Sequence, residues 1–224
     1  MVKITHCIFD MDGLLLDTER IYTQITTELL ARHGKSYTWE LKSRLMGLRV
    51  RDSVALLIKE TQIDMTIDEY IIERTKLEEI KFPHSKPMPG VLRLVKHLNA
   101  HKIPISVATS SNRNNFKIKS SNNQELFSLF DDITCGDDPN VHNGKPAPDI
   151  FLAARTKAGN PSVSQCLVFE DAINGIQAAR NAGMHVIWVP DPNLAALYPG
   201  DNGATEVISS LEHFDPTKYE LPPF

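Results

Sequence analysis

The chain of 224 residues has little cysteine: Cys7, Cys135 and Cys166 lie far apart, with no Cys-x-x-Cys pair. This spacing excludes a fold that depends on a dense disulfide framework. Two of the three cysteines lie in apolar runs that are typical of strands. We therefore interpret all three as reduced, buried thiols of a protein in a reducing compartment.

Long apolar segments and runs of basic residues are also missing. No stretch approaches the length of a membrane-spanning helix, and Asp10 and Asp12 interrupt the apolar segment near the N-terminus that a signal peptide would need. The net charge of −4 and the lack of a Lys/Arg run argue against nucleic acid or an anionic membrane as the main partner. We expect a cytoplasmic protein that binds neither a nucleic acid polymer nor a membrane.

The pattern of apolar residues predicts a parallel sheet. The hydrophobic content of 42% suits one substantial domain, with or without a smaller insertion. Five short, nearly continuous apolar runs predict strands that are buried on both faces, at residues 6–10, 104–109, 131–136, 165–171 and 185–190. Helical patterns separate most of these runs, and two of the helical patterns end at Gly159 and Gly183. This alternation predicts an α/β fold with a Rossmann-like, doubly wound sheet.

One connection is much longer than the fold requires. More than ninety residues separate the first two predicted strands, whereas a simple crossover needs about a dozen or two. Helical patterns fill this gap, at residues 19–34, 38–47, 51–62 and 66–82. We expect Asp17-Thr18 to cap the first of these helices, and Thr38, Asp52 and Thr66 lie near the starts of the others. We therefore expect an inserted all-helical domain at residues 18–82, within a core formed by residues 1–17 and 83–224. The proline-rich return segment 83–90 is typical of a semi-rigid hinge.

Polar residues follow four of the predicted strands where they end. They are Asp10 and Asp12, then Thr109, Ser110 and Ser111, then Lys145 in the loop "GKPAPD", and finally Glu170 and Asp171. Because the carboxyl ends of parallel strands share one rim, these side chains are expected to converge there. Crowded carboxylates either take up protons or bind a cation, and oxygen ligands without His or Cys suit Mg²⁺. Together with Lys145, such a cation would hold a dianionic phosphate, as phosphoryl transfer requires.

Four motifs carry a resemblance to a known family. "DMDGLLLDTE", "VATSSN", "GKPAPDIF" and "VFEDAINGIQAARNAG" occur in the order found in the haloacid-dehalogenase-type phosphatase superfamily, and together they span nearly the whole chain. The helical insertion resembles the mobile cap of that superfamily. A closer resemblance is to the eukaryotic pseudouridine-5′-phosphatase group, carried by "THCIFDMDGLLLDTERIYT" and "CLVFEDAINGIQAARNAGMHVIWVPDPNL". The cap resembles that group more loosely than the core does.

The resemblance implies a role for each rim residue. Asp10 would attack phosphorus to form an aspartyl-phosphate, while Asp12 would protonate the leaving oxygen and later activate water. Mg²⁺ would bind the Asp10 carboxylate, the Asp12 carbonyl and Asp171, with Glu170 bound directly or through water. Thr109, Ser110 and Lys145 would hold the phosphoryl oxygens. In the cap, Gly47, Arg49 and Arg51 are candidate substrate contacts, although a charged helix face would also explain the arginines.

The expected activity is hydrolysis of a small phosphomonoester, with pseudouridine 5′-phosphate as the leading substrate. Phosphatases of nucleotides, 2-deoxysugar phosphates or glycerol phosphate are alternatives. A β-phosphoglucomutase-like phosphomutase is disfavoured, because that family carries a His where this chain has Tyr22, and a dehalogenase is disfavoured by the second aspartate, Asp12. A non-catalytic regulator that binds a phosphorylated ligand is disfavoured because every motif residue is present. We expect a monomer, since the cap must open freely.

Overall fold

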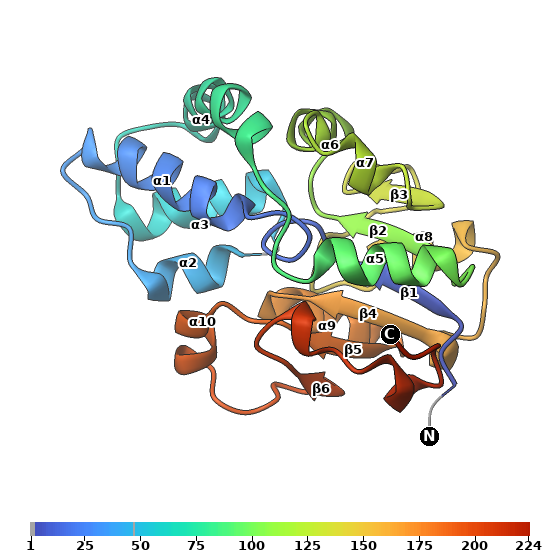
Figure 1. The fold of residues 1–224 in the computed structure, drawn as a ribbon. Helices are drawn as coiled ribbons and strands as arrows, with labels where there is room; N and C mark the ends of the chain where they lie inside the picture. The colour runs from blue at the N-terminus through green and yellow to red at the C-terminus, as the bar shows by residue number, and fades with distance from the viewer. Residues whose placement is uncertain (1–2, 47) are drawn as a thin grey trace.

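The computed structural model describes residues 3–46 and 48–224, and in them six parallel strands form one sheet. The strands are β1 (His6–Phe9), β2 (Ile105–Thr109), β3 (Asp132–Cys135), β4 (Cys166–Glu170), β5 (His185–Trp188) and β6 (Glu206–Val207). Their order is β3-β2-β1-β4-β5-β6 (Figure 1). The five predicted strands and the α/β fold class are therefore confirmed. The two-residue edge strand β6 is too short to give an apolar pattern, which is why the sequence did not indicate it.

Helices cover both faces of the sheet. The helices α5 (Val91–Ala100), α6 (Arg113–Ser120) and α7 (Gln124–Phe127) pack on one face, and α8 (Asp149–Lys157), α9 (Ile173–Asn181) and α10 (Pro192–Leu197) pack on the other. Along β1 the side chains alternate, so Cys7 and Phe9 join the first layer and Ile8 joins the second. Burial on both faces explains the continuous apolar runs of the sequence.

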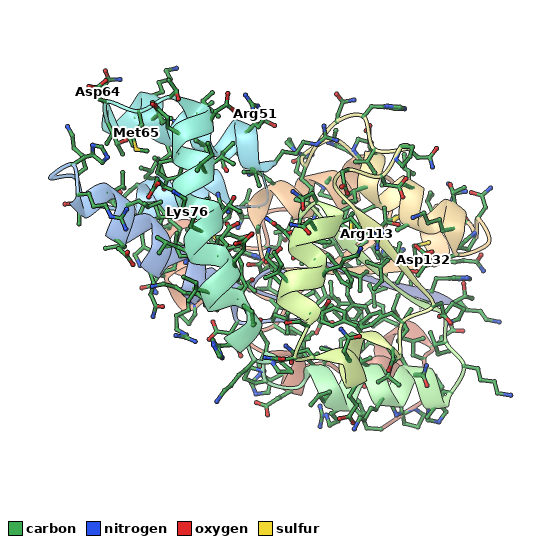
Figure 2. All side chains as sticks on the ribbon, turned by 90° about the horizontal axis from the view of Figure 1, so that it is seen from above. Arg51, Asp64, Met65, Lys76, Arg113 and Asp132 are labelled. Atoms are coloured by element: carbon green, nitrogen blue, oxygen red, sulfur yellow. The ribbon has the colours of Figure 1, made fainter. Side chains whose placement is uncertain are left out.

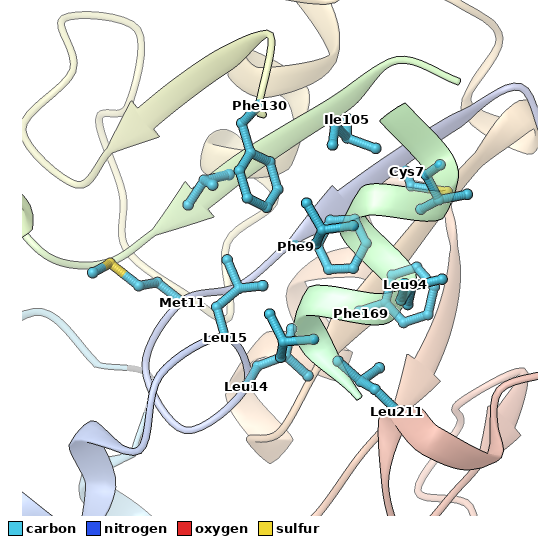
Figure 3. Close-up of a cluster of buried hydrophobic side chains, with 14 of the residues drawn as sticks. Cys7, Phe9, Met11, Leu14, Leu15, Leu94, Ile105, Phe130, Phe169 and Leu211 are labelled. Carbon is cyan, nitrogen blue, oxygen red and sulfur yellow. The ribbon is translucent and has the colours of Figure 1, made fainter. Parts of the chain in front are cut away.

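Aromatic packing fixes β1 beside β4. The rings of Phe9 and Phe169 stack with their centroids 4.6 Å apart, and Phe130 meets Phe9 edge-on at 5.8 Å. Figure 3 shows this cluster beside helix α5, with Leu94 of that helix next to Phe169. The C-terminal segment also packs on this face, where Tyr219 is buried, as expected for a tail that covers the core. The ends of β1 and β4 are thereby held at a fixed spacing.

The four helices expected in the insertion are present, as α1 (Thr18–Ala31), α2 (Trp39–Leu45), α3 (Val50–Thr61) and α4 (Ile67–Lys81). We call them the cap helices. They surround their own apolar cluster, which contains Ile25, Leu57 and Tyr70, and they lie beyond the end of the sheet where β2 and β4 terminate (Figure 1). The assignment of residues 18–82 as a separate domain stays a prediction.

The ends of the cap helices are capped in part as expected. Thr66 forms a reciprocal capping box with Glu69 at the start of α4, and the Thr38 hydroxyl accepts a hydrogen bond from Leu41 N at 3.3 Å. The expectation that the Asp17 side chain caps α1 is wrong. Its carboxylate instead accepts a hydrogen bond from Arg20 Nε at 2.8 Å.

Two short segments connect the core to the cap helices, residues 14–17 on the way out and residues 86–88 on the way back. The backbone N–H of Asp17 donates to the Lys86 carbonyl at 2.9 Å, and that of Met88 donates to the Leu15 carbonyl at 3.0 Å. Leu16 and Pro87 form a β-bridge between them. We call this paired connection the hinge. Its hydrogen bonds hold the outgoing and the returning segment next to each other.

The three cysteines are free and buried, in agreement with the interpretation of reduced thiols. Within the described part of the chain, no helix combines the length and the apolar character needed to cross a bilayer.

Candidate active site

Carboxylates from β1 and β4 meet at one rim of the sheet. Asp10 follows β1, while Glu170 and Asp171 come at the end of β4, which is the direct neighbour of β1. One oxygen from each of these three residues lies within 4.8 Å of the others, and all three side chains are buried. We call Asp10, Glu170 and Asp171 the acidic cluster.

Lys145 compensates part of this negative charge. Its Nζ atom donates to Asp10 Oδ1 at 2.5 Å and also donates to Glu170 Oε1, and the lysine is only 3% exposed. The ammonium also lies 5.0 Å from the ring centre of Phe151. Because a buried charge is tolerated only when it is paired, Lys145 and the cluster depend on each other. One cation is nevertheless too few for three carboxylates.

Two glycines make room for the acidic cluster. A Cβ atom on Gly13 would lie 2.2 Å from Asp171 Oδ2, and one on Gly175 would lie 1.9 Å from the carboxyl carbon of Glu170. Gly13 also adopts a φ of +84°, which favours glycine. The "DG" of the first motif and the "NG" of the last therefore have a steric reason: they let two carboxylates approach the backbone.

The crowding changes the acidity of the cluster. Burial raises the pKa of Asp10 to about 8, with Lys145 opposing the rise and the charges of Glu170 and Asp12 adding to it. Burial, followed by the charges of Glu170 and Asp10, also raises the pKa of Asp171 well above its ordinary value. Such a site favours either protons or a cation. Three converging carboxylates without His or Cys fit a hard divalent ion, so the donor set agrees with the Mg²⁺ predicted from the sequence.

The metal-free protein is expected to lose stability as the pH rises from about 6 to about 8. Because the pKa of Asp10 is raised from 3.8 to about 8 in the folded state, the folded protein holds a proton that the unfolded chain has already released, and the free energy of unfolding falls with pH across this interval. The loss from this group is about 2 kcal/mol. Denaturation curves in EDTA measure it, and the same curves in Mg²⁺ should show a smaller loss. Equal stability at both pH values in EDTA would contradict the raised pKa.

Asp12 lies in a different environment from Asp10. Its Oδ1 atom accepts hydrogen bonds from Thr18 Oγ1 at 2.7 Å and from Lys119 Nζ at 2.6 Å. Its Oδ2 atom accepts from Ser111 Oγ at 3.0 Å and from Thr109 Oγ1 at 3.4 Å. Although burial opposes it, the charge of Lys119 and these hydrogen bonds lower the pKa of Asp12. Each aspartate of the first motif is therefore paired with a different lysine, Asp10 with Lys145 and Asp12 with Lys119.

Lys119 was not predicted from the sequence. It lies on α6, three residues after the buried Phe116, so both side chains share one helix face. Its spacing of three residues from the apolar Phe116 is the one signal in the sequence, and it is a weak one. No helix was predicted at α6, because its sequence "RNNFKIKS" has few apolar residues.

A cavity of about 90 Å³ lies between the rim and the cap helices. The core side contributes Asp10, Asp12, Ser110, Ser111 and the end of β4, and the cap side contributes Glu19, Tyr22, Thr26, Tyr37, Tyr70 and Arg74, among others. The cavity thus joins the predicted nucleophile and acid–base residue to a wall with several hydroxyl groups. Thr109 lies beneath it, fully buried, and Ser111 N donates to its hydroxyl at 3.1 Å.

Two of the cap residues predicted to contact substrate, Arg49 and Arg51, have other partners in the structure. The guanidinium of Arg49 donates to the carbonyls of Val141 and His142 at 2.7 and 2.9 Å, just before the loop of Lys145. Arg51, labelled in Figure 2, forms an exposed ion pair with Asp68 at 2.7 Å. Gly47 lies outside the described residues. A role for these three residues in substrate binding stays a prediction.

The chain is similar to known proteins in sequence and in fold. Residues 7–189 match the model of a family described as haloacid dehalogenase-like hydrolase. The chain is 45% identical to a Drosophila melanogaster protein named probable pseudouridine-5′-phosphatase, over 99% of this chain and 96% of that protein. It is 44% identical to (DL)-glycerol-3-phosphatase 2 of Arabidopsis thaliana, over 99% and 93%. The crystal structure of CbbY from Rhodobacter sphaeroides in complex with phosphate superposes with a TM-score of 0.79 at 22% identity, covering 94% of this chain and 96% of that one.

Proposed function

Since this chain belongs to the haloacid dehalogenase-like hydrolase family and is a phosphoric monoester hydrolase, we propose that it is a Mg²⁺-dependent phosphatase that works through an aspartyl-phosphate on Asp10. The observation that carries the proposal is the contrast between the two aspartates. Asp10 belongs to the acidic cluster and contacts Lys145, while Asp12 is held by a second lysine and three hydroxyl groups. Without a metal ion the pKa of Asp10 is raised and that of Asp12 is lowered. The proposed roles therefore require that Mg²⁺ at the acidic cluster would keep Asp10 ionised, and that Asp12 takes up a proton from water before the first transfer.

In the first half of the reaction, an Asp10 oxygen attacks phosphorus as the bond from phosphorus to the ester oxygen breaks. Asp12 donates a proton to the departing oxygen, so the alcohol leaves uncharged. Lys145 fixes Asp10 Oδ1 and, with the Thr109 and Ser110 segment at the end of β2, balances the charge of the phosphoryl oxygens. Bound at the acidic cluster, Mg²⁺ would supply further neutralisation of the phosphoryl charge.

In the second half, a water molecule attacks phosphorus and Asp12 takes a proton from it. The bond between phosphorus and the Asp10 oxygen breaks, and phosphate leaves with Asp10 restored as a carboxylate. The cap helices and the hinge exclude bulk water during the first transfer and admit the single water of the second. We propose a monomer as the active form, because the cap helices must move freely relative to the core.

Pseudouridine 5′-phosphate is the substrate that we propose, with pseudouridine and phosphate as products. The relatives of Drosophila and of Saccharomyces cerevisiae, 45% and 40% identical, are both named probable pseudouridine-5′-phosphatase. The hydroxyl groups of Thr26, Tyr37 and Tyr70 around the cavity are suited to bind a polyhydroxylated leaving group.

Glycerol phosphate is the second candidate substrate, and a specific observation favours it. The cavity of about 90 Å³ is smaller than most ligand pockets, which favours a compact leaving group. Two Arabidopsis relatives, 44% and 45% identical, are named (DL)-glycerol-3-phosphatase.

Phosphate release from a panel of esters tests the proposal. Pseudouridine 5′-phosphate, glycerol phosphate, uridine 5′-phosphate and 2-deoxyribose 5-phosphate are compared by kcat/KM, in Mg²⁺ and in EDTA. We expect release that requires Mg²⁺, with pseudouridine 5′-phosphate preferred by about tenfold or more. A preference for glycerol phosphate would replace it with the second candidate.

The same panel tests the other activities. An isomerised sugar phosphate without free phosphate would indicate a phosphomutase and overturn the proposal. The absence of turnover of every ester, together with tight binding of one of them, would indicate a non-catalytic regulator.

A further inference from the structure

Lys119 is a buried cation that the proposed chemistry does not use. Its side chain is fully buried between the sheet and the cap helices. The Nζ atom donates three hydrogen bonds, to Asp12 Oδ1 at 2.6 Å, to Ser111 Oγ at 2.7 Å and to Tyr22 Oη at 2.5 Å. An ammonium group has three donors, so all of them are used.

The contacts of Lys119 close a ring around Asp12. Ser111 Oγ accepts from Lys119 and itself donates to the other oxygen of Asp12, at 3.0 Å. Thr18, the first residue of the cap helix α1, donates to the same oxygen as Lys119. Asp12 therefore cannot rotate without breaking a charge-assisted hydrogen bond, which is the stronger kind.

The cap supplies the rest of the surroundings of this ammonium. Its Nζ atom lies 4.8 Å from the ring centre of Phe82, which follows α4, in addition to its hydrogen bond with Tyr22 on α1. The two rings meet edge-on, with centroids 4.8 Å apart. A lysine of the core thus fills an aromatic recess formed by the two ends of the cap segment. Cation–π contacts of this kind gain strength when water is excluded.

We propose that Lys119 is a positioning residue that fixes the orientation of Asp12 for proton transfer, and that Tyr22 links this orientation to closure of the cap. This inference rests on the proposed role of Asp12 as acid and base. If the cap helices move away from the core, Lys119 loses the Tyr22 hydrogen bond and the contact with the Phe82 ring at once, and Thr18 moves with α1. Asp12 then keeps its core partners Lys119, Ser111 and Thr109, and its full set of contacts is present only while the cavity is covered.

The proposal predicts that the effect of a substitution at Lys119 depends on the leaving group of the ester. An alkoxide is a poor leaving group and needs the proton of Asp12, whereas p-nitrophenolate departs readily without one. A change that misorients Asp12 should therefore slow alkyl phosphates much more than p-nitrophenyl phosphate. General damage to the site would slow both esters alike.

The experiment measures kcat/KM for p-nitrophenyl phosphate and for the best alkyl ester of the panel, in the wild type and in Lys119→Gln, Lys119→Arg and Tyr22→Phe. We expect Lys119→Gln to lower the value for the alkyl ester by about 100-fold or more and that for the aryl ester by less than about tenfold. Tyr22→Phe keeps the ring and removes one hydrogen bond, so it should lower the alkyl value by about tenfold with little effect on the aryl value. Lys119→Arg should recover part of the alkyl activity.

The control variant is Lys96→Gln, which removes an exposed lysine paired with Glu125 on the outside of α5 and α7. It should leave both values unchanged. An equal loss for both esters in Lys119→Gln and in Tyr22→Phe would overturn the proposal. If Lys119→Gln does not fold, the test depends on Tyr22→Phe and Lys119→Arg. The proposal is then overturned if the ratio of kcat/KM for the alkyl ester to that for the aryl ester equals the wild-type ratio in both variants.

Asp12→Asn separates this inference from the proposed function. If Asp12→Asn slows the alkyl ester selectively and the Lys119 variants do not, the positioning role is wrong and the acid–base role of Asp12 stands. If Asp12→Asn itself slows both esters equally, the assignment of the acid is wrong, and the positioning role of Lys119 is overturned with it.

Discussion

Asp10→Asn is expected to abolish phosphate release while leaving the fold at least as stable as in the wild type. The amide cannot act as the nucleophile, so kcat should fall by about 10⁴-fold or more. The same substitution removes one of three crowded carboxyl groups, and with it the group whose pKa is raised to about 8. In EDTA at a pH of about 8, the variant should therefore resist denaturation better than the wild type.

This opposite response of activity and stability separates a catalytic role from a structural one. Phosphate release and urea denaturation are measured on the same preparations, with Asp52→Asn as the matched control. Asp52 lies in the first turn of α3 and is exposed, so its amide variant should match the wild type in both measurements. An Asp10→Asn protein that releases phosphate at the wild-type rate would show that another residue is the nucleophile.

Lys145→Met should impair both activity and stability. The methionine keeps most of the length of the side chain but leaves Asp10 and Glu170 without their buried cation. Removing one partner of a buried ion pair costs about 3–5 kcal/mol, because the remaining charge stays buried without compensation. The loss of kcat/KM should be about 10³-fold, since no ammonium then faces the phosphoryl group.

Mg²⁺ should restore part of the stability of Lys145→Met and little of its activity. A divalent cation at the acidic cluster replaces the missing positive charge, so the stability gained on adding Mg²⁺ should be larger in the variant than in the wild type. Thermal denaturation across a Mg²⁺ titration measures this gain. Lys157→Met, which removes a lysine paired with Asp138 outside the cluster, is the control. A gain no larger than that of the wild type would contradict the proposal that Mg²⁺ binds the carboxylates paired with Lys145.

The main chain of the core and much of its site were predictable because they depend on local patterns. Asp10, Thr109 and Glu170 each end or follow an apolar run, and parallel strands bring such positions to one rim in any strand order. The sheet order adds only that β4 is the direct neighbour of β1. The helices of the insertion were predictable for the same reason, since capping residues such as Thr66 lie at their starts.

What could not be predicted depends on packing between distant segments. Lys119 belongs to a short helix without a clear apolar stripe, and its partners Asp12 and Tyr22 are about a hundred residues earlier in the chain. The contacts of Arg49 could not be predicted either. Its partners are backbone carbonyls of a core loop, and every residue type carries such a carbonyl. A lysine or an arginine in a sequence shows its charge but not its counterpart.

The hinge brings the beginning and the end of the inserted segment next to each other, with Leu16 bridged to Pro87. A genetic exchange of the inserted segment would have to rejoin the chain only at these two neighbouring positions. The sheet, with the acidic cluster at its rim, would be unchanged. Selectivity for the alcohol could thus change in one evolutionary event, provided that the new segment again supplied partners for Asp12 and Lys119, as Thr18 and Tyr22 do here.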